Sequence, residues 1–529
     1  MKFLKNITKI LGIILIIIIM FFAYLMISFS PQYIIGYLRA GEGFSDYKNY
    51  STKEIKNSNN VFHFKKELDE EYIEVLFDYK LRILGVTTFE EYIKKTKTTA
   101  LIVIRNDTII YEKYFNGFQE DDLSMAMSMT KSFVNTLIGI AIDEGYIKNV
   151  NDPITNYLPE LKERDPRFEK ITLKHLLMMC SGIDPKISKF KGIPLPWDGE
   201  AIAWGHPKLR KYLLHRLDIS HEPGKMFNYT SFNSELLGLI LERSINKSVS
   251  EYFEEKIWKL GGMEYSGLWT LHSEKSAFEI MNGGMNARPI DYARYGRLFL
   301  KKGCYDRKQV IPKDWVIEST KDENTLNIKD YYPPVPSKWL SNTHYKYHWK
   351  GHMDPDSSMS YSIGGVMGQN VFIAPHKNLI IVHCGTNHKY YGVGDLWSIS
   401  RLMDNPFYKI MHTHGLSGAI AYADSLLKNN QERIVSEGLL NLIGYDFIYE
   451  GRLEDAIAIF ELSIRLYPLS SNAYDSLGEA YMKNGQIDLT IKNYEKSLEL
   501  NPDNENAQEI LNKLKNLNQK IKIMEGILL

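Results

Sequence analysis

Residues 124–145 read SMAMSMTKSFVNTLIGIAIDEG, a long apolar run that carries a serine and a lysine near its start. From Phe133 to Ala141 the apolar residues recur at the spacing of one helix face, which predicts a helix over residues 128–144. Gly145 follows the last apolar residues and is placed to end the helix. This stretch predicts a buried helix that begins at a serine.

Ser128 and Lys131 have the spacing of a catalytic pair. A serine in the first turn of a helix faces the positive end of the helix dipole and free backbone N–H groups. Lys131 follows three residues later, so both side chains lie on one face, one turn apart. A lysine removed from water can take up the serine proton, and the hydroxyl oxygen can then attack a carbonyl carbon.

Ser-x-x-Lys occurs five times, so the surrounding sequence must decide among the copies. The other copies fall in an N-terminal polar segment, in a loop containing Lys, Gly and Pro, at a helix end, and in the C-terminal helical region. Only Ser128 begins a long apolar helix shortly after a predicted hairpin. The five copies are Ser45–Lys48, Ser128–Lys131, Ser188–Lys191, Ser244–Lys247 and Ser425–Lys428.

Two predicted β-hairpins enclose the helical region. Asn106-Asp107 supplies the turn of the first hairpin, and residues 375–378 supply the turn of the second. Helices between an early and a late hairpin indicate an α+β or α/β sandwich whose sheet is completed by both ends. Strands are expected at 100–104, 109–111, 371–373 and 379–382, and further helices at 173–179, with Thr172 as N-cap, and at 234–242.

The sequence after about residue 413 repeats every 34 residues. This is the tetratricopeptide period, in which small and aromatic residues mark the packing of two helices and a proline precedes the next repeat. Ala456 occupies the usual small position, whereas Thr490 replaces alanine in the second copy. Helical stretches at 418–428 and 505–516 are expected to flank the repeats. The matched pairs are Gly444 and Gly478, Phe460 and Tyr494, Ser463 and Ser497, and Pro468 and Pro502.

Residues 10–29 contain no charged residue and are almost wholly apolar. Twenty helical residues span ~30 Å, about the thickness of the hydrocarbon core of a membrane. Lys2, Lys5 and Lys9 precede the run, which predicts a single-pass anchor with a cytoplasmic N-terminus and the rest of the chain outside the cell membrane. A cleaved signal peptide is the alternative, but residues 26–31 make a poor cleavage site.

The overall composition excludes some functions. The 529 residues predict more than one domain, and 64 Lys+Arg against 64 Asp+Glu leave no net charge to attract nucleic acid. Cys180, Cys304 and Cys384 are too few and too scattered for a zinc site or a disulfide framework. The predicted divisions are a tail at 1–9, an anchor at 10–29, a stalk or entry segment at 30–94, a catalytic domain at 95–412 and a repeat domain at 413–529.

Further motifs follow the Ser-x-x-Lys helix. Phe227-Asn228-Tyr229-Thr230-Ser231 lies between a Glu-Pro-Gly turn and Leu236-Leu237-Gly238, with Tyr229 101 residues after Ser128. Over residues 95–405 the chain resembles the class C β-lactamase-like serine hydrolases, which include penicillin-binding proteins, esterases and aminohexanoate-oligomer hydrolases. Other matches are Asn151-Asp152-Pro153, the runs 171–177 and 287–294, Ser181-Gly182 and Gly261-Gly262-Met263.

The resemblance implies an α/β (α+β) β-lactamase/penicillin-binding-protein-like fold, with an antiparallel sheet and a helical subdomain, before the all-α repeats. It implies that Tyr229 relays the proton as general base or shares that work with Lys131, and that Ser231 orients Lys131 or the substrate. An oxyanion hole is implied at the N–H groups of Ser128 and Val366, beside Gly365. No cofactor or metal is implied.

One family element, Lys-Thr-Gly, is missing. Gly364-Gly365-Val366-Met367-Gly368-Gln369 stands at the matching place. The lysine of that element holds the carboxylate of a β-lactam or a peptidoglycan stem, so its absence favours an esterase or amidase over a β-lactamase or DD-peptidase.

Three hypotheses follow from the sequence: a hydrolase that forms an acyl-serine, a binding protein in which only the repeats function, and a cell-wall DD-peptidase. In the first, the repeats recruit a peptide or protein partner. His352, Asp354 and Asp356 form a loop without metal-binding spacing, and His383 is interpreted as a satisfied strand histidine.

Overall fold

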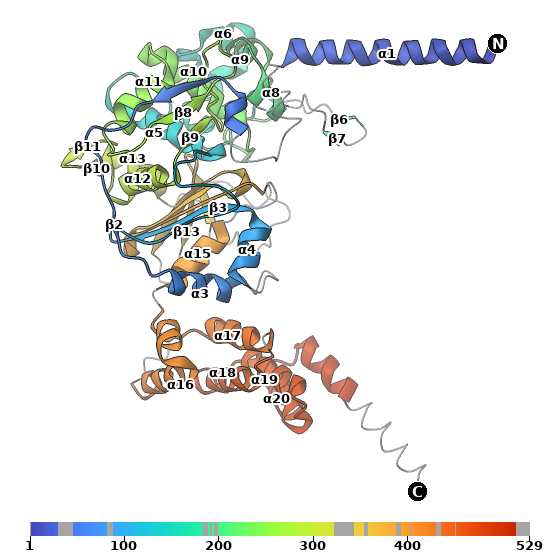
Figure 1. The fold of residues 1–529 in the computed structure, drawn as a ribbon, viewed down its shortest axis with the longest axis vertical. Helices are drawn as coiled ribbons and strands as arrows, with labels where there is room; N and C mark the ends of the chain where they lie inside the picture. Colours follow the sequence, from blue (N-terminus) through green and yellow to red (C-terminus); the bar gives the residue numbers. More distant parts are fainter. Residues whose placement is uncertain are drawn as a thin grey trace. The chain divides into compact units, whose positions relative to one another are not determined.

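The computed structural model divides into two compact units, which are described separately (Figure 1). Unit 1 comprises Met1–Glu70 and Ile93–Trp397, and unit 2 comprises Glu71–Tyr92 and Ser398–Leu529. Ser45, Ser188, Asp354 and Asp356 lie outside the described residues. The structure describes residues 2–29, 46–81, 88–183, 189–190, 193–194, 199–321, 343–353, 358–387, 393–403, 405–429, 435–449 and 451–514.

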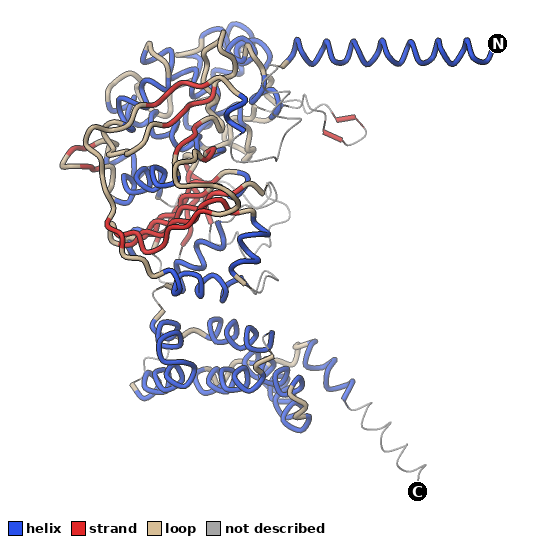
Figure 2. Tube along the Cα trace, in the orientation of Figure 1, coloured by secondary structure: helices blue, strands red, loops and turns tan. Residues whose placement is uncertain are grey.

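An eight-stranded sheet forms the centre of unit 1 (Figure 2). Its strands pair antiparallel except at one edge, where β2 runs parallel to β4. The predicted antiparallel sheet is therefore confirmed with one parallel pair added. In spatial order the strands are β12 (Thr343–Lys346), β13 (Trp349–Met353), β14 (Met359–Gly364), β15 (Asn370–Ala374), β16 (Leu379–Gly385), β3 (Thr98–Arg105), β4 (Thr108–Tyr114) and β2 (Lys65–Lys66).

Both predicted hairpins are present. Asn106 and Asp107 turn the chain between β3 and β4 with φ of 54° and 60°, a conformation that Asn and Asp tolerate better than other side chains. Asn378 has φ of 48° between β15 and β16. Strand β16 pairs with β3, so the early and late hairpins join in the middle of the sheet.

Helix α12 (Pro289–Leu300) packs against the sheet on the side where α5 and α10 lie (Figure 1). Gly296 permits this approach, because a Cβ at this position would lie 2.8 Å from Val371 Cγ1. Helix α5 (Thr130–Asp143) and helix α10 (Ser231–Ile245) pack together above it. Phe133 of α5 is fully buried against Tyr295 of α12, with ring centroids 4.5 Å apart. This packing holds the start of α5 rigidly above the sheet.

The predicted helices match the structure closely. Gly145, with φ of 79°, follows α5 as expected, and Thr172 caps the helix after it by accepting from His175 N at 3.3 Å. Helix α10 begins at Ser231, three residues earlier than predicted. The other helices of unit 1 are α6 (Pro159–Arg164), α7 (Leu173–Leu177), α8 (Gly199–Gly205), α9 (Leu209–Arg216), α11 (Val249–Phe253) and α13 (Lys313–Thr320).

A second, four-stranded sheet lies among these helices. Its strands, in order, are β1 (Thr52–Ile55), β8 (Gly267–Thr270), β9 (Met285–Ala287) and β5 (Ser124–Met125). Strand β5 ends shortly before Ser128, the predicted catalytic serine. Three further short hairpin or helical pieces are β6–β7 (Lys189–Phe190 and Ile193–Pro194), β10–β11 (Cys304–Tyr305 and Lys308–Gln309) and a π-turn at Glu254–Trp258.

The N-terminal segment forms helix α1 (Lys2–Ser28). Within the described residues, no helix is long and apolar enough to cross a membrane. The anchor expected at 10–29 therefore stays a prediction.

Unit 2 contains the repeats as antiparallel helix pairs. A Cβ on Gly444 would lie 2.3 Å from the Phe460 ring, so the small residue lets the two helices of the first repeat approach closely. Thr490 is fully buried where the first repeat has Ala456, and its hydroxyl donates to Gln486 O at 3.1 Å. The helices are α16 (Pro406–Lys428, kinked at Gly415), α17 (Glu437–Tyr449), α18 (Leu453–Leu466), α19 (Ser471–Lys483), α20 (Ile487–Leu500) and a helix over 505–514. Helices α3 (Glu70–Leu81), α4 (Phe89–Thr96) and α15 (Val393–Leu402) each cross the boundary between the units.

Candidate active site

Ser128 lies in a tight turn between β5 and α5. The 3-10 turn spans Met127–Met129, and α5 begins at Thr130, so the serine precedes the α-helix by two residues. The prediction that Ser128 begins the helix was therefore wrong: Ser128 lies in the turn, and the α-helix begins at Thr130. Met127 has φ of 47°, a conformation that is uncommon for a residue with a side chain. The turn leaves Ser128 partly exposed although its neighbours Met127 and Met129 are buried.

Lys131 reaches back from the first turn of α5 to the serine. Its Nζ lies 3.0 Å from Ser128 Oγ, and the residue is 2% exposed. The same Nζ donates to the backbone carbonyl of Asn282 at 2.8 Å. The sequence pattern placed the pair on one helix face, but it did not reveal Asn282, because the interaction uses a carbonyl oxygen that every residue has.

Tyr229 lies beside Lys131, as the motif spacing predicts. Its ring centroid is 5.2 Å from Lys131 Nζ, close enough for a cation–π interaction when the amine is protonated. The Tyr345 ring packs edge-on against Tyr229, with centroids 6.3 Å apart, and also against Phe227. Ser231 is the first residue of α10 and is 3% exposed. Residues from three distant parts of the chain thus meet at one point.

The glycine-rich segment after β14 passes directly over the Ser128 turn. A Cβ on Gly365 would lie 2.9 Å from Ser128 N and 2.8 Å from Ala126 O, so only glycine fits without a shift. Gln369 fixes the segment from the other side: its Oε1 accepts from Ser124 Oγ at 3.1 Å, and its Nε2 donates to Gly385 O at 2.7 Å.

Val366, the predicted second oxyanion donor, follows Gly365 in a 3-10 turn and is 37% exposed. It is bonded to Gly365, at which an added Cβ would lie 2.9 Å from Ser128 N. Two N–H groups that converge on one point can stabilise a developing oxyanion.

A fully buried pair, Glu235 and His272, lies near Lys131 and is linked to it through Asn282. Both are 0% exposed at the side chain, and His272 Nε2 is 3.3 Å from Glu235 Oε2. Glu235 Oε1 accepts from the backbone N–H groups of Met281 and Asn282, each at 3.0 Å. Burial raises the pKa of Glu235, and His272 and Lys131 oppose that rise. This pair was not predicted from the sequence; an acidic residue six positions after Tyr229 on an apolar helix was the available signal.

His348 is hydrogen-bonded to the backbone of Lys131. It occupies the turn between β12 and β13, and its Nδ1 is 2.8 Å from the backbone carbonyl of Lys131. Ser132 Oγ donates to His348 O at 2.8 Å, so the turn is bound to α5 twice. Burial lowers the pKa of His348 to about 3, so the ring is neutral at physiological pH and Nδ1–H donates.

Within the described parts of the chain, no three His, Cys, Asp or Glu residues are grouped to hold a metal ion. His352 Nε2 lies 3.2 Å from Ser362 Oγ. His383 is satisfied on both ring nitrogens, by Thr98 Oγ1 at 2.8 Å and Gly368 O at 2.7 Å, as interpreted from the sequence.

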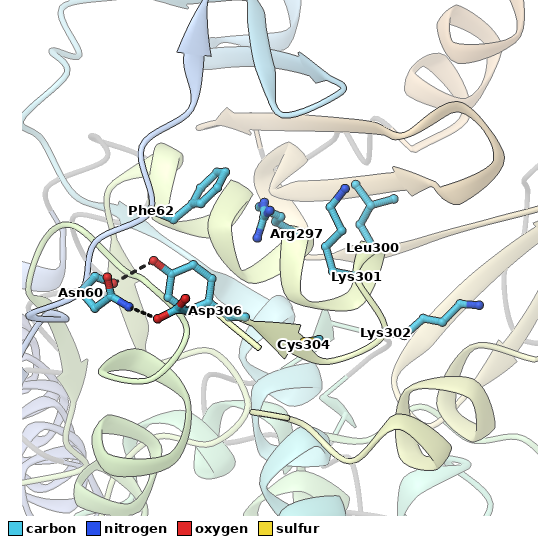
Figure 3. A pocket seen from close by; sticks show the side chains of 9 residues that line it. Asn60, Phe62, Arg297, Leu300, Lys301, Lys302, Cys304 and Asp306 are labelled. Atoms are coloured by element: carbon cyan, nitrogen blue, oxygen red, sulfur yellow. Dashed lines mark hydrogen bonds between the residues drawn. The ribbon is translucent and has the colours of Figure 1, made fainter. Parts of the chain in front are cut away.

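A separate surface hollow of 680 Å³ lies elsewhere in unit 1 (Figure 3). Two hydrogen bonds link its wall: Tyr305 Oη donates to Asn60 O at 2.9 Å, and Asn60 Nδ2 donates to Asp306 at 2.8 Å. It contains none of the predicted site residues. Its lining residues are Asn60, Phe62, Arg297, Leu300, Lys301, Lys302, Cys304, Tyr305 and Asp306.

Comparison with known proteins agrees with this geometry. The Beta-lactamase family model matches residues 87–388, more than half of the chain, and a tetratricopeptide repeat model matches residues 471–504. A 6-aminohexanoate-dimer hydrolase of Paenarthrobacter ureafaciens is 25% identical over 329 residues, which cover 60% of this chain and 81% of that protein. An uncharacterized protein of Alkalihalophilus pseudofirmus is 22% identical over 311 residues, 54% of this chain and 82% of that protein.

A solved structure from Bacillus anthracis, provisionally named 6-aminohexanoate-dimer hydrolase, has the same fold. It superposes with a TM-score of 0.57 at 23% identity, covering 69% of this chain and 92% of that one. The chain therefore belongs to the beta-lactamase family of serine hydrolases and carries a C-terminal tetratricopeptide repeat region.

Proposed function

We propose that this hydrolase cleaves an ester or amide bond through an acyl-enzyme on Ser128. The observation that carries the proposal is the 3.0 Å approach of Lys131 Nζ to Ser128 Oγ, within a site where Lys131 is buried. A neutral lysine at this distance is placed to accept the hydroxyl proton as the oxygen attacks.

The proposed reaction proceeds in two halves. The Ser128 O–H bond breaks, its proton passes to Lys131 Nζ, and Oγ bonds to the carbonyl carbon while the N–H groups of Ser128 and Val366 receive the oxyanion. The proton then moves to the leaving oxygen or nitrogen, with Tyr229 as relay, and the bond to the leaving group breaks. Water attacks the acyl carbon, gives a proton to Lys131, and Ser128 regains it as the acid departs.

The substrate class is argued from two features. Strand β14 ends in Ile363-Gly364, is followed by Gly365, and lacks the family's Lys-Thr-Gly, so this segment offers no lysine to a substrate carboxylate. One relative is named a 6-aminohexanoate-dimer hydrolase, and the two amino acids of such a dimer are joined by an amide bond. Both favour an ester or amide over a β-lactam or a peptidoglycan stem peptide.

The test uses residues 40–529 and the matched Ser128→Ala variant. Both proteins are treated with a fluorophosphonate and with a labelled penicillin, and covalent adducts are measured by mass spectrometry. We expect a fluorophosphonate adduct on wild type that Ser128→Ala abolishes, with little penicillin adduct. Strong penicillin acylation would instead indicate a DD-peptidase, and no adduct with either reagent would indicate a binding protein in which only the repeats function.

We further propose that the repeats recruit a peptide or protein partner and that residues 10–29 hold the protein at the cell membrane with its bulk outside. The repeats stack helix pairs, which present a groove. Side chains of α1 such as Ile13, Ile16 and Met20 are 58%, 58% and 63% exposed, so this helix presents apolar side chains that a membrane could cover. Fractionation of the full chain against residues 40–529 tests the anchor: only the full chain should sediment with membranes.

A further inference from the structure

The buried pair Glu235–His272 is connected to Lys131 through the backbone of a single residue, Asn282. Glu235 Oε1 accepts from Asn282 N at 3.0 Å, and Asn282 O accepts from Lys131 Nζ at 2.8 Å. The N–H and C=O of Asn282 belong to consecutive rigid peptide planes that meet at its Cα, so the bond to Glu235 fixes the plane that precedes the Cα from which the C=O extends. The second bond of Oε1, to Met281 N, restrains the peptide that comes before.

The hydrogen bonding indicates which atoms of the pair carry protons. His272 Nδ1 is buried and has no hydrogen-bond partner among the described residues, whereas Nε2 faces Glu235 Oε2. A proton on Nδ1 would be a buried donor without an acceptor, which is costly. The arrangement of lowest cost therefore places the ring proton on Nε2, which donates it to Glu235 Oε2.

The direction of the Asn282 carbonyl matters to the reaction. A neutral lysine amine has two N–H donors and one lone pair. When one N–H donates to Asn282 O, rotation about the Cε–Nζ bond is restricted, and the lone pair can be held toward Ser128 Oγ at 3.0 Å. Without that acceptor the amine would rotate freely, and the lone pair would face the hydroxyl only part of the time.

We propose that Glu235 and His272 are positioning residues for the proton acceptor Lys131, acting through the backbone of Met281 and Asn282. This inference rests on the proposed function of Ser128 and Lys131. It assigns the carboxylate of Glu235 to alignment of the amine, and the imidazole of His272 to holding that carboxylate in place.

The test compares Glu235→Gln with Glu279→Gln. The first keeps the shape and an oxygen acceptor but removes the charge. The second makes the same change at another carboxylate that is fully buried, bonded to Ser250 Oγ at 2.5 Å and Lys53 Nζ at 3.3 Å, with no bond to Met281 or Asn282. Fluorophosphonate acylation of the full chain in detergent is followed over reagent concentration to separate kinact from KI, and thermal unfolding is recorded for each variant.

We expect Glu235→Gln to lower kinact by ~10-fold to 100-fold with KI unchanged, while Glu279→Gln keeps kinact near wild type even where it lowers the unfolding temperature. If Glu235→Gln does not fold, His272→Gln takes its place and should lower kinact less. Equal kinact in wild type, Glu235→Gln and Glu279→Gln would overturn the inference and leave the proposed function intact. Failure of wild type to label would overturn both.

Discussion

The two units of this protein use hydrogen bonds over very different sequence distances. In the repeats, Tyr445 donates to Glu479 at a separation of 34 residues, and Ser476 donates to Asn441 at a separation of 35. In the active site, Lys131 donates to the carbonyl of Asn282 across 151 residues. The repeat unit is thus built from interactions between adjacent copies, whereas the site depends on the folding of most of unit 1. A substitution in one repeat should therefore destabilise only the repeats. A substitution in the candidate active site should lower the rate of acylation without reducing helix content.

This difference can be measured with two spectroscopic probes, one of which reports on unit 1 alone. All eight tryptophans lie between residues 197 and 397, which belong to unit 1. Tryptophan fluorescence therefore follows the unfolding of unit 1 alone, whereas far-ultraviolet circular dichroism follows the helices of both units.

The largest expected effect is at Lys131, the proposed proton acceptor. Lys131→Met keeps the apolar stem and removes the amine, so fluorophosphonate acylation of Ser128 should slow by about a thousandfold. Lys346→Met is the control, because this lysine is also fully buried but its amine pairs with Glu318 at 2.8 Å. Comparable acylation by the two variants would contradict the role of Lys131. The fluorescence transition verifies that each variant is folded.

A smaller loss of acylation rate is expected from adding a methyl group at Gly365, in the segment that contains the proposed oxyanion donor Val366. Gly365→Ala would place a methyl group 2.9 Å from Ser128 N, forcing the segment away from the serine, and kinact should fall by about a hundredfold. Gly364→Ala is the neighbouring control, since the three atoms nearest its Cβ would be Asn370 Nδ2 at 3.3 Å and Gln369 O and Lys350 Nζ at 3.7 Å. If both variants lose the same activity, the segment would be sensitive to any methyl group, not specifically to contact with Ser128.

Substitutions in the repeats should change the stability of the repeats and leave the acylation rate at Ser128 unchanged. Gly444→Ala would place Cβ 2.3 Å from the Phe460 ring, and the clash should destabilise the repeats by ~1–3 kcal/mol. Gly478→Ala, 3.1 Å from the Tyr494 ring, should cost less, and Gly438→Ala, with no atom within 4 Å, should not destabilise. The loss should appear by circular dichroism and be absent from tryptophan fluorescence and acylation rates. A matching shift in fluorescence would show that the two units unfold together.

The smallest effect concerns an ion pair at the first hairpin. Burial alone would raise the pKa of Asp107, but its hydrogen bonds and charge pairing with Arg297 outweigh burial and lower it below the ordinary value of 3.8. The carboxylate therefore stabilises unit 1 above that value, and this contribution is lost as the pH falls through the lowered pKa.

Asp107→Asn keeps a residue suited to the turn and removes the charge. It should lower the free energy of unfolding by about 1 kcal/mol at pH 7, and the difference from wild type should be smaller at pH 3. Urea titrations followed by tryptophan fluorescence at both pH values measure this. A difference of equal size at pH 3 would mean that packing, and not charge, sets the effect.

Much of the fold could be predicted because it is encoded over short distances. The turn at Asn106-Asp107 and the cap at Thr172 depend on a few neighbouring residues, and both were predicted correctly. The start of helix α10 at Ser231 was missed because Ser231 is polar, and nothing in the sequence indicates that it is buried. Strands β12 and β13 were not predicted, since their Tyr, Lys and His residues lack the alternation of a half-buried strand.

The sequence by itself determined the spacing of Ser128 and Lys131, the distance to Tyr229 and the 34-residue period of the repeats. These are properties of residue type and position along one chain. Only the tertiary structure decided that the Asn282 carbonyl meets Lys131, that Glu235 and His272 lie behind it, and that Gly365 passes over Ser128 N. The physical reason is that these interactions use backbone groups common to every residue, so residue identity carries no sign of them until the chain is folded.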